Sequence, residues 1–218
     1  MRRITCMGLI VIGLVCQMFL IVPADATPPV DVASAAQEGI KTFAKLFSSQ
    51  DFKANANVTS DLDKAFVGEG FQVFTIPPDR LLSANASDSF NSLAMPSTIW
   101  EFLVMTDGKA TGIVTVDRMN GVWKAVSFGK AGLAKQLEAG LKAWPAGYQL
   151  RLIRIYQAMS DFIEVSSADK ILGVVPLTSA KAALSMMGAP FNPADIQNDG
   201  DMVTKLIPIV RKNLLNAY

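Results

Sequence analysis

The segment that decides the fold is residues 99–128, which read IWEFLVMTDGKATGIVTVDRMNGVWKAVSF. Two short turn sequences, Asp107-Gly108 and Asn120-Gly121, divide this segment into three runs rich in β-branched and aromatic residues. Asp-Gly and Asn-Gly favour two-residue hairpin turns, because both central positions of such a turn take a positive φ angle. The segment therefore predicts a three-strand antiparallel meander over about 99–128.

Further helices and strands are predicted on both sides of this meander. Helical periodicity covers 31–47, 131–144 and 201–216, and strand-like runs cover 71–76, 149–157, 161–167 and 171–175. Consecutive strands with helices at both ends predict an α+β domain with a mainly antiparallel sheet packed by helices, and they do not indicate a parallel βαβ repeat. The Ser- and Asn-rich stretch 79–98 predicts a long surface loop. No motif in the chain is specific enough to name a family.

The first 26 residues have the pattern of a secretory signal peptide. Two arginines precede an apolar run over residues 4–22, and Ala24-Asp25-Ala26 places small residues where signal peptidase reads them. This pattern predicts cleavage between Ala26 and Thr27, which leaves residues 27–218 as a single secreted or periplasmic domain. The alternative is an N-terminal membrane anchor, since the apolar run is long enough to cross a bilayer.

The composition excludes several classes of chemistry. Twenty Lys and Arg residues balance nineteen Asp and Glu residues, so the chain lacks the positive charge expected of a general nucleic-acid-binding protein. The absence of His excludes Ser-His-Asp catalysis and His-ligated metals. Both cysteines, Cys6 and Cys16, precede the predicted cleavage site, so the mature domain has no thiol for disulfides or metal binding. We therefore expect no cofactor.

One segment, residues 195–201, has the clustered oxygen ligands of a calcium-binding loop. Its twelfth position is Leu206, where an EF-hand needs a bidentate Glu, so we expect a polar turn that caps the last helix through Asp199 or Asp201 and no metal site.

Carboxylate pairs and Ser-Lys pairs are the catalytic groups still open to a chain without His. The carboxylate candidates are Glu69, Asp79, Glu101, Asp161 and Glu164. No spacing pairs them, and Glu101 and Glu164 are expected on the solvated sides of their strands. Neither Ser179 near Lys181 nor Ser127 near Lys130 resembles the Ser-x-x-Lys turn of a helix, in which the two side chains face each other across one turn. We therefore predict no catalytic residue.

A binding surface is the remaining functional prediction. Arg151 and Arg154, together with Tyr148 and Trp123, could form a small platform that binds an acidic or aromatic group. The three-residue separation of the two arginines places them on opposite faces of a strand, which weakens a joint role.

These observations favour an exported, non-catalytic binding module, such as an inhibitor, adaptor or chaperone-like protein. The loop 79–98 or the outer face of the meander is the expected contact surface. An extracytoplasmic carrier or sensor with an apolar pocket is the alternative, and a His-free hydrolase is a third hypothesis. The expected partner is an exported protein or a small apolar ligand, with no nucleic acid and no membrane span after signal cleavage.

Overall fold

The computed structural model describes residues 27–48, 62–144, 146–168, 170–186 and 191–216. The predicted signal peptide, residues 1–26, lies outside the described residues, and so does Ala26 on one side of the predicted cleavage site.

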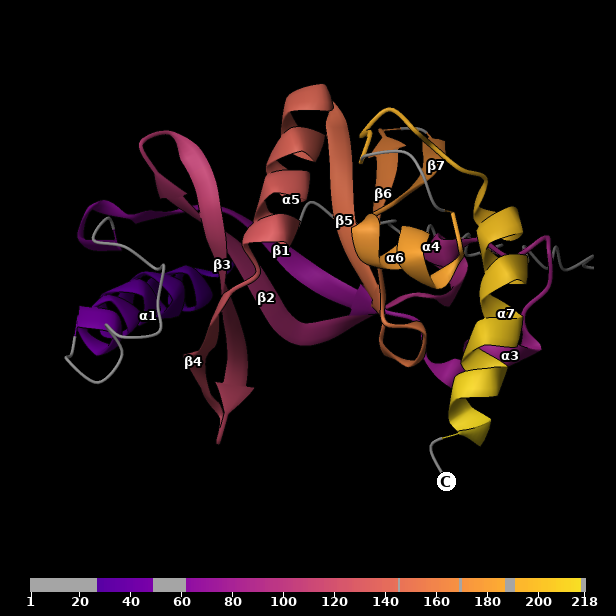
Figure 1. The fold of residues 1–218 in the computed structure, drawn as a ribbon, viewed down its shortest axis with the longest axis horizontal. Helices are drawn as coiled ribbons and strands as arrows, with labels where there is room; N and C mark the ends of the chain where they lie inside the picture. Colours follow the sequence, from indigo (N-terminus) through magenta and orange to yellow (C-terminus); the bar gives the residue numbers. More distant parts are fainter. Residues whose placement is uncertain (1–26, 49–61, 145, 169, 187–190, 217–218) are drawn as a thin grey trace, which may run out of the picture.

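One seven-stranded sheet organises the described chain, with the strand order β4-β3-β2-β1-β5-β6-β7 (Figure 1). The strands are β1 (Phe66–Thr75), β2 (Met95–Thr106), β3 (Lys109–Met119), β4 (Val122–Gly129), β5 (Tyr148–Ile155), β6 (Ser160–Ser167) and β7 (Lys170–Pro176). The α-helices are α1 (Val30–Ser48), α3 (Pro78–Ser83), α4 (Phe90–Leu93), α5 (Ala131–Ala143), α6 (Thr178–Ala183) and α7 (Asp199–Leu215). Two 3₁₀ turns complete the elements: η1 (Leu62–Lys64) and η2 (Tyr156–Ala158). The α+β class is confirmed.

The predicted mainly antiparallel sheet with a three-strand meander over 99–128 is corrected in two respects. The two hairpins form as predicted, but they belong to a larger sheet, in which β1 also pairs antiparallel with β2. The sheet is mixed, because β1 and β5 pair in parallel. The chain leaves β4, returns through α5 and enters β5 beside β1, a long-range pairing that local turn signals do not encode.

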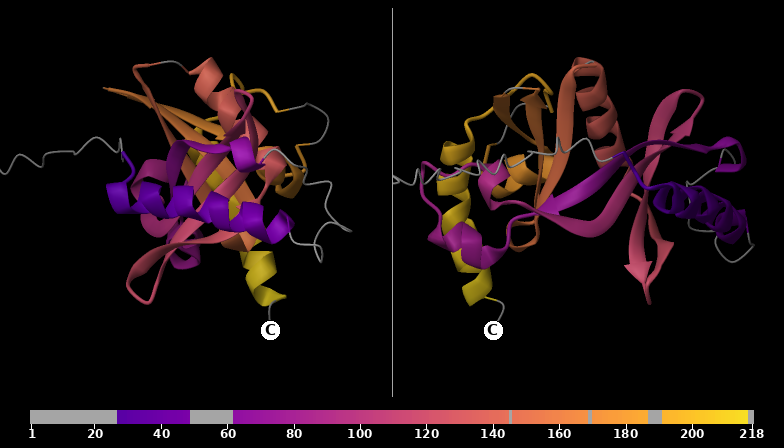
Figure 2. Two further views of the ribbon diagram at one scale, coloured as in Figure 1. Left: turned by 90° about the vertical axis from the view of Figure 1, so that its left-hand side faces the viewer. Right: turned by 180° about the vertical axis from the view of Figure 1, so that it is seen from behind.

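Helices cover both faces of the sheet. Trp100 and Phe102 of β2 pack with Ile40 of α1 on one face, whereas Leu103 of β2 packs with Leu137 of α5 on the other. Figure 2 shows α1 in indigo across one end of the sheet. Helix α1 approaches β4 so closely at Gly39 that a Cβ there would overlap the Ala125 Cβ. No helix within the described ranges has both the length and the apolar character that crossing a membrane requires.

The segment predicted as a surface loop, 79–98, instead contains α3, α4 and the first residues of β2. Leu81 and Phe90 are fully buried in a core that they share with Leu206 of α7. Helix α4 begins with a capping box, in which the hydroxyl of Ser89 accepts from the Ser92 N–H and the Ser92 hydroxyl accepts from the Ser89 N–H. The small polar residues therefore cap short helices whose few apolar side chains find a partner in α7.

The strands β1 and β5 are paired along only part of their length. Their three residue pairs are Val73 with Leu152, Phe74 with Ile153 and Thr75 with Arg154. Figure 1 shows the two strands diverging from this shared end, with the ribbon of α5 beside the opening. Beyond these three pairs, the backbones of β1 and β5 are not paired with each other, although both strands lie in the middle of the sheet.

Candidate functional site

A pocket of about 180 Å³ occupies the opening between β1 and β5. The C-terminal end of α5 and residues 27–28 complete its walls. Residues from both faces of the sheet line it, because the strands are apart at this point. Its aromatic lining consists of Phe71, Phe74, Trp144 and Tyr148, and its polar lining includes Glu69, Gln72, Gln149 and Arg151. A concave site with aromatic walls and a few polar groups is the usual form of a small-molecule site.

The aromatic wall is held by one contact within it and one contact outside the pocket. The rings of Trp144 and Tyr148 meet edge to face with centroids 5.0 Å apart. The Trp144 indole Nε1 donates to the Pro193 carbonyl at 2.9 Å, which orients the indole. Tyr148 is 41 % exposed, so its ring forms part of the accessible wall. The two rings stand at 67° to each other and form a preformed aromatic corner, which lowers the entropic cost of binding a ligand there.

Arg151 is the cationic side chain that lines the pocket. Its guanidinium lies 4.6 Å from the centroid of the Phe74 ring, and its Nε donates to Glu164 Oε2 at 2.7 Å. Its Nη2 forms an ion pair with the same oxygen. Despite this contact Nη2 makes no hydrogen bond, and Nη1 makes none within the described part of the chain, so one edge of the planar guanidinium has hydrogen-bonding capacity left.

Two buried carboxyl groups lie behind Arg151. Glu164 Oε1 and Asp199 Oδ1 are buried without a hydrogen-bond partner among the described residues, whereas Asp199 Oδ2 accepts from the Phe90 N–H at 3.1 Å. Burial raises the pKa of Glu164; the charge of Arg151 opposes this shift and the charge of Asp199 adds to it. Burial also raises the pKa of Asp199, opposed by the Phe90 N–H and by Arg151. These carboxyl groups therefore hold protons at higher pH than ordinary ones.

Asp199→Asn is expected to change the pH dependence of stability. The folded-state pKa of Asp199 is raised above the ordinary value of 3.8, so its stabilising contribution is complete below that value and is lost as pH rises through the folded pKa. The amide introduced by the substitution would keep an acceptor for the Phe90 N–H and carry no charge. Urea unfolding at a series of pH values should show the wild type losing stability relative to the variant as pH rises. A difference that stays constant with pH would contradict this expectation.

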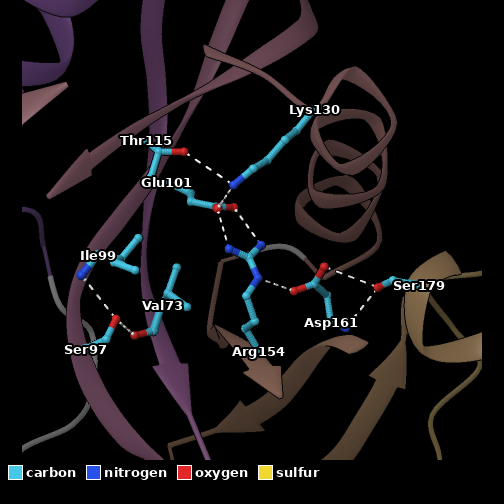
Figure 3. Close-up of polar contacts among 9 residues, drawn as sticks. All are labelled: Val73, Ser97, Ile99, Glu101, Thr115, Lys130, Arg154, Asp161 and Ser179. Atoms are coloured by element: carbon cyan, nitrogen blue, oxygen red, sulfur yellow. Dashed lines mark hydrogen bonds and ion pairs between the residues drawn. The ribbon is translucent and has the colours of Figure 1, made fainter. Parts of the chain in front are cut away.

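A second charged cluster lies on the opposite face of β5 (Figure 3). Glu101 is fully buried, and its Oε1 accepts from Lys130 Nζ at 2.5 Å and from Arg154 Nη1 at 2.8 Å. Arg154 Nε donates to Asp161 Oδ1 at 2.6 Å, and Ser179 Oγ donates to Asp161 Oδ2 at 3.2 Å. Although burial opposes its charge, hydrogen bonds and charge interactions with Glu101 and Asp161 raise the pKa of Arg154. Two carboxylates thus balance two cations in a structural network.

The expectation that Glu101 and Glu164 lie on solvated strand faces is wrong. Their exposures are 0 % and 2 %, because helices cover both faces of the sheet and each carboxylate has an arginine partner there. Strand alternation predicts which residues share a face but not whether that face meets water. The buried carboxyl of Asp199 was also missed, because its burial depends on which surfaces α7 meets. The prediction that Asp199 or Asp201 caps this helix is wrong: the cap is Asn198, whose side chain accepts from the Asp201 N–H.

The structure separates the four predicted platform residues. Tyr148 and Arg151 both line the pocket between β1 and β5. Arg154 belongs to the Glu101 cluster on the other face, as the three-residue spacing indicated. Trp123 lies on β4 beside α1, with the Arg118 guanidinium 6.0 Å from its ring centroid. Trp144, at the end of the helix predicted over 131–144, is a pocket residue that the platform prediction missed.

The other catalytic candidates do not converge on this pocket, apart from Glu69 at its rim. Asp79 is an exposed residue of α3, whereas Lys130 binds Glu101 and Lys181 forms an ion pair with Asp195 at 3.4 Å. Among the residues that the structure describes, no three His, Cys, Asp or Glu side chains are grouped to hold a metal ion. No protein-family model matches the chain, and comparison with curated proteins and with solved structures gave no significant match.

Proposed function

We propose that this protein is an exported carrier or sensor that binds a small molecule in the pocket between β1 and β5. The observation that supports it best is the combination, in one pocket, of an aromatic wall and an arginine with hydrogen-bonding capacity left. Its volume of about 180 Å³ suits a ligand smaller than a typical drug, since sites for drug-sized molecules are several hundred Å³. Export is proposed from residues 1–26 alone.

The site supports binding better than hydrolysis. A hydrolase without His needs two catalytic groups that converge in a cleft. Glu101 and Asp161 are each held by cations and lie outside the pocket lining. Glu164 and Asp199 lie behind Arg151 and are almost fully buried, which keeps them from direct contact with a substrate.

The test is a small-molecule screen that compares two tyrosine variants. Compounds that raise the unfolding temperature of the wild type should lose about tenfold or more in affinity for Tyr148→Ala, because a wall of the site is removed. Tyr156→Ala is the matched control, since Tyr156 is 45 % exposed and lies outside the pocket. Native mass spectrometry of the protein from its own exported fraction would identify a retained ligand. The proposal fails if no compound binds, or if binding does not depend on Tyr148.

A second candidate function is protein binding along β4. This strand is at one end of the sheet, and its Val122 and Val126 side chains are 58 % and 44 % exposed. An exposed edge strand can recruit a partner strand by backbone hydrogen bonding. A variant with Val122→Lys and Val126→Lys should lose an exported protein that the wild type retains in affinity capture. Retention by both proteins, or by neither, would count against this function.

A further inference from the structure

The charge in the pocket favours one class of ligand. Arg151 is the only Lys or Arg among the described lining residues, and its Nη1 has no protein acceptor there. A carboxylate is the natural partner of such a nitrogen, since hydrogen bonds between two charged groups are shorter and stronger than neutral ones. Phe71, Trp144 and Tyr148 would enclose a flat apolar body attached to that carboxylate.

We propose that the pocket binds a small aromatic carboxylate through Arg151, and that binding is coupled to the uptake of a proton by the buried Glu164–Asp199 pair. This inference rests on the proposed small-molecule function. It adds the chemical class of the ligand and a dependence of affinity on pH.

The coupling follows from competition for one guanidinium. Ionised Glu164 already neutralises Arg151 through Nε and Nη2, so a ligand carboxylate would meet an arginine that is partly satisfied. Protonation of Glu164 removes that competing charge and leaves Arg151 to the ligand. Because a proton and a ligand anion then enter together, the buried site keeps its net charge, which avoids the cost of an uncompensated buried ion.

Two charged groups that face Glu164 shift the equilibrium between its ionised and protonated forms. Arg151 of β5 favours its ionised form, and Asp199 of α7 favours its protonated form. On β7, the residue paired with Glu164 is Val174, which carries no charge. Asp199 faces Arg151 and the Phe90 N–H of α4. Affinity for a carboxylate should therefore fall as pH rises through the raised pKa of Glu164, by at most about tenfold per pH unit for one coupled proton.

Glu69 provides a second check on the sign of the ligand charge. This exposed side chain lies at the rim of the pocket, where solvent and salt screen its charge. Glu69→Gln should tighten the binding of an anion slightly, by about twofold, at low ionic strength. A cationic ligand would respond in the opposite direction.

The experiment measures the affinity of benzoate and of its neutral isostere benzamide by isothermal titration calorimetry between about pH 5 and about pH 8. At the lowest pH of this range, benzoate should bind more tightly than benzamide by about tenfold or more. Arg151→Met should remove this preference, whereas Arg118→Met, a substitution outside the pocket, should keep it. Glu164→Gln should bind benzoate tightly at every pH. Asp199→Asn should shift the pH at which affinity falls to a lower value, because it removes a charge that disfavours ionised Glu164.

Circular dichroism first establishes that each variant is folded, because Arg151→Met leaves Glu164 buried without its cation. If that variant does not fold, Glu164→Gln and Asp199→Asn still test whether binding is coupled to proton uptake. The comparison of benzoate with benzamide still tests whether the site prefers a negatively charged ligand. Equal binding of benzoate and benzamide, or unchanged pH dependence in Glu164→Gln, would overturn the inference. If other compounds bind in a manner that depends on Tyr148 but not on Arg151, the small-molecule function stands and the carboxylate inference fails. If no compound binds, both fail.

Discussion

Glu101→Gln is expected to lower the free energy of unfolding by about 3–5 kcal/mol, the usual cost of removing one partner from a buried ion pair. The substitution keeps the size of the side chain but leaves Arg154, whose side chain is 14 % exposed, without its second carboxylate. Lys130 loses the same partner, but its side chain is 39 % exposed and can turn to water. Most of the loss should therefore come from the buried guanidinium.

Glu138→Gln is the matched control for this measurement. Glu138 forms an ion pair with Lys142 one turn along α5, at 2.7 Å; the Glu138 side chain is 15 % exposed, but its cation is 69 % exposed and can turn to water when the carboxylate is removed. Loss of such a helical i,i+4 pair usually costs about 0.3–0.5 kcal/mol. Urea unfolding of the two variants and the wild type gives both differences. Equal losses in the two variants would show that burial adds nothing to the Glu101 contacts.

Gly173→Ala is expected to destabilise the protein by about 3 kcal/mol, the sum of backbone strain and overpacking. Gly173 has a φ of +138°, which L side chains rarely adopt. A Cβ at this position would overlap the Gln197 carbonyl and lie 2.7 Å from Ile196 Cγ2. The segment around Gln197 binds β7 through two backbone hydrogen bonds to Val174, so the substitution should separate it from the strand.

Gly121→Ala serves as the comparison, because it introduces the backbone strain of a positive φ without a steric overlap of the new Cβ. Gly121 also has a positive φ, +82°, but a Cβ there would meet no atom within 4 Å. Its cost should be about 1 kcal/mol, which represents backbone strain alone. Hydrogen exchange should show loss of protection at Val174 and Gln197 in Gly173→Ala and unchanged protection in Gly121→Ala. Equal destabilisation by the two substitutions would contradict the proposed overlap.

The two arginines of β5, Arg151 and Arg154, have different roles because the strand directs their side chains to opposite faces of the sheet. Arg154 joins β2, β5 and β6 through Glu101 and Asp161, with every charge paired. Arg151 faces the side of the sheet that α7 covers, where it meets Glu164 and reaches the pocket. A strand between two covered faces can therefore place a structural cation and a ligand-binding cation three residues apart.

The local signals in the sequence predicted the two hairpin turns and helix α5 correctly. The hairpin turns Asp107-Gly108 and Asn120-Gly121 both take positive φ angles at both residues, as turns of this kind require. The helix predicted over 131–144 is α5, Ala131–Ala143. The opposite directions of Arg151 and Arg154 followed from strand periodicity. Each of these features depends on residues that are close in the chain, so local sequence patterns are enough to predict it.

Features that depend on distant residues could not be predicted in this way. Sequence reasoning placed Glu101 and Glu164 in water, because one sequence does not say that helices cover both faces of the sheet. The pocket arises where β1 separates from β5, and these strands meet only after the chain has passed through α3, α4, β2, β3, β4 and α5. Local residue patterns are sufficient for the turns, the periodicity and the α+β class. The parallel pairing, the burial of the carboxylates and the pocket come from tertiary packing, because burial and long-range pairing depend on which surfaces meet.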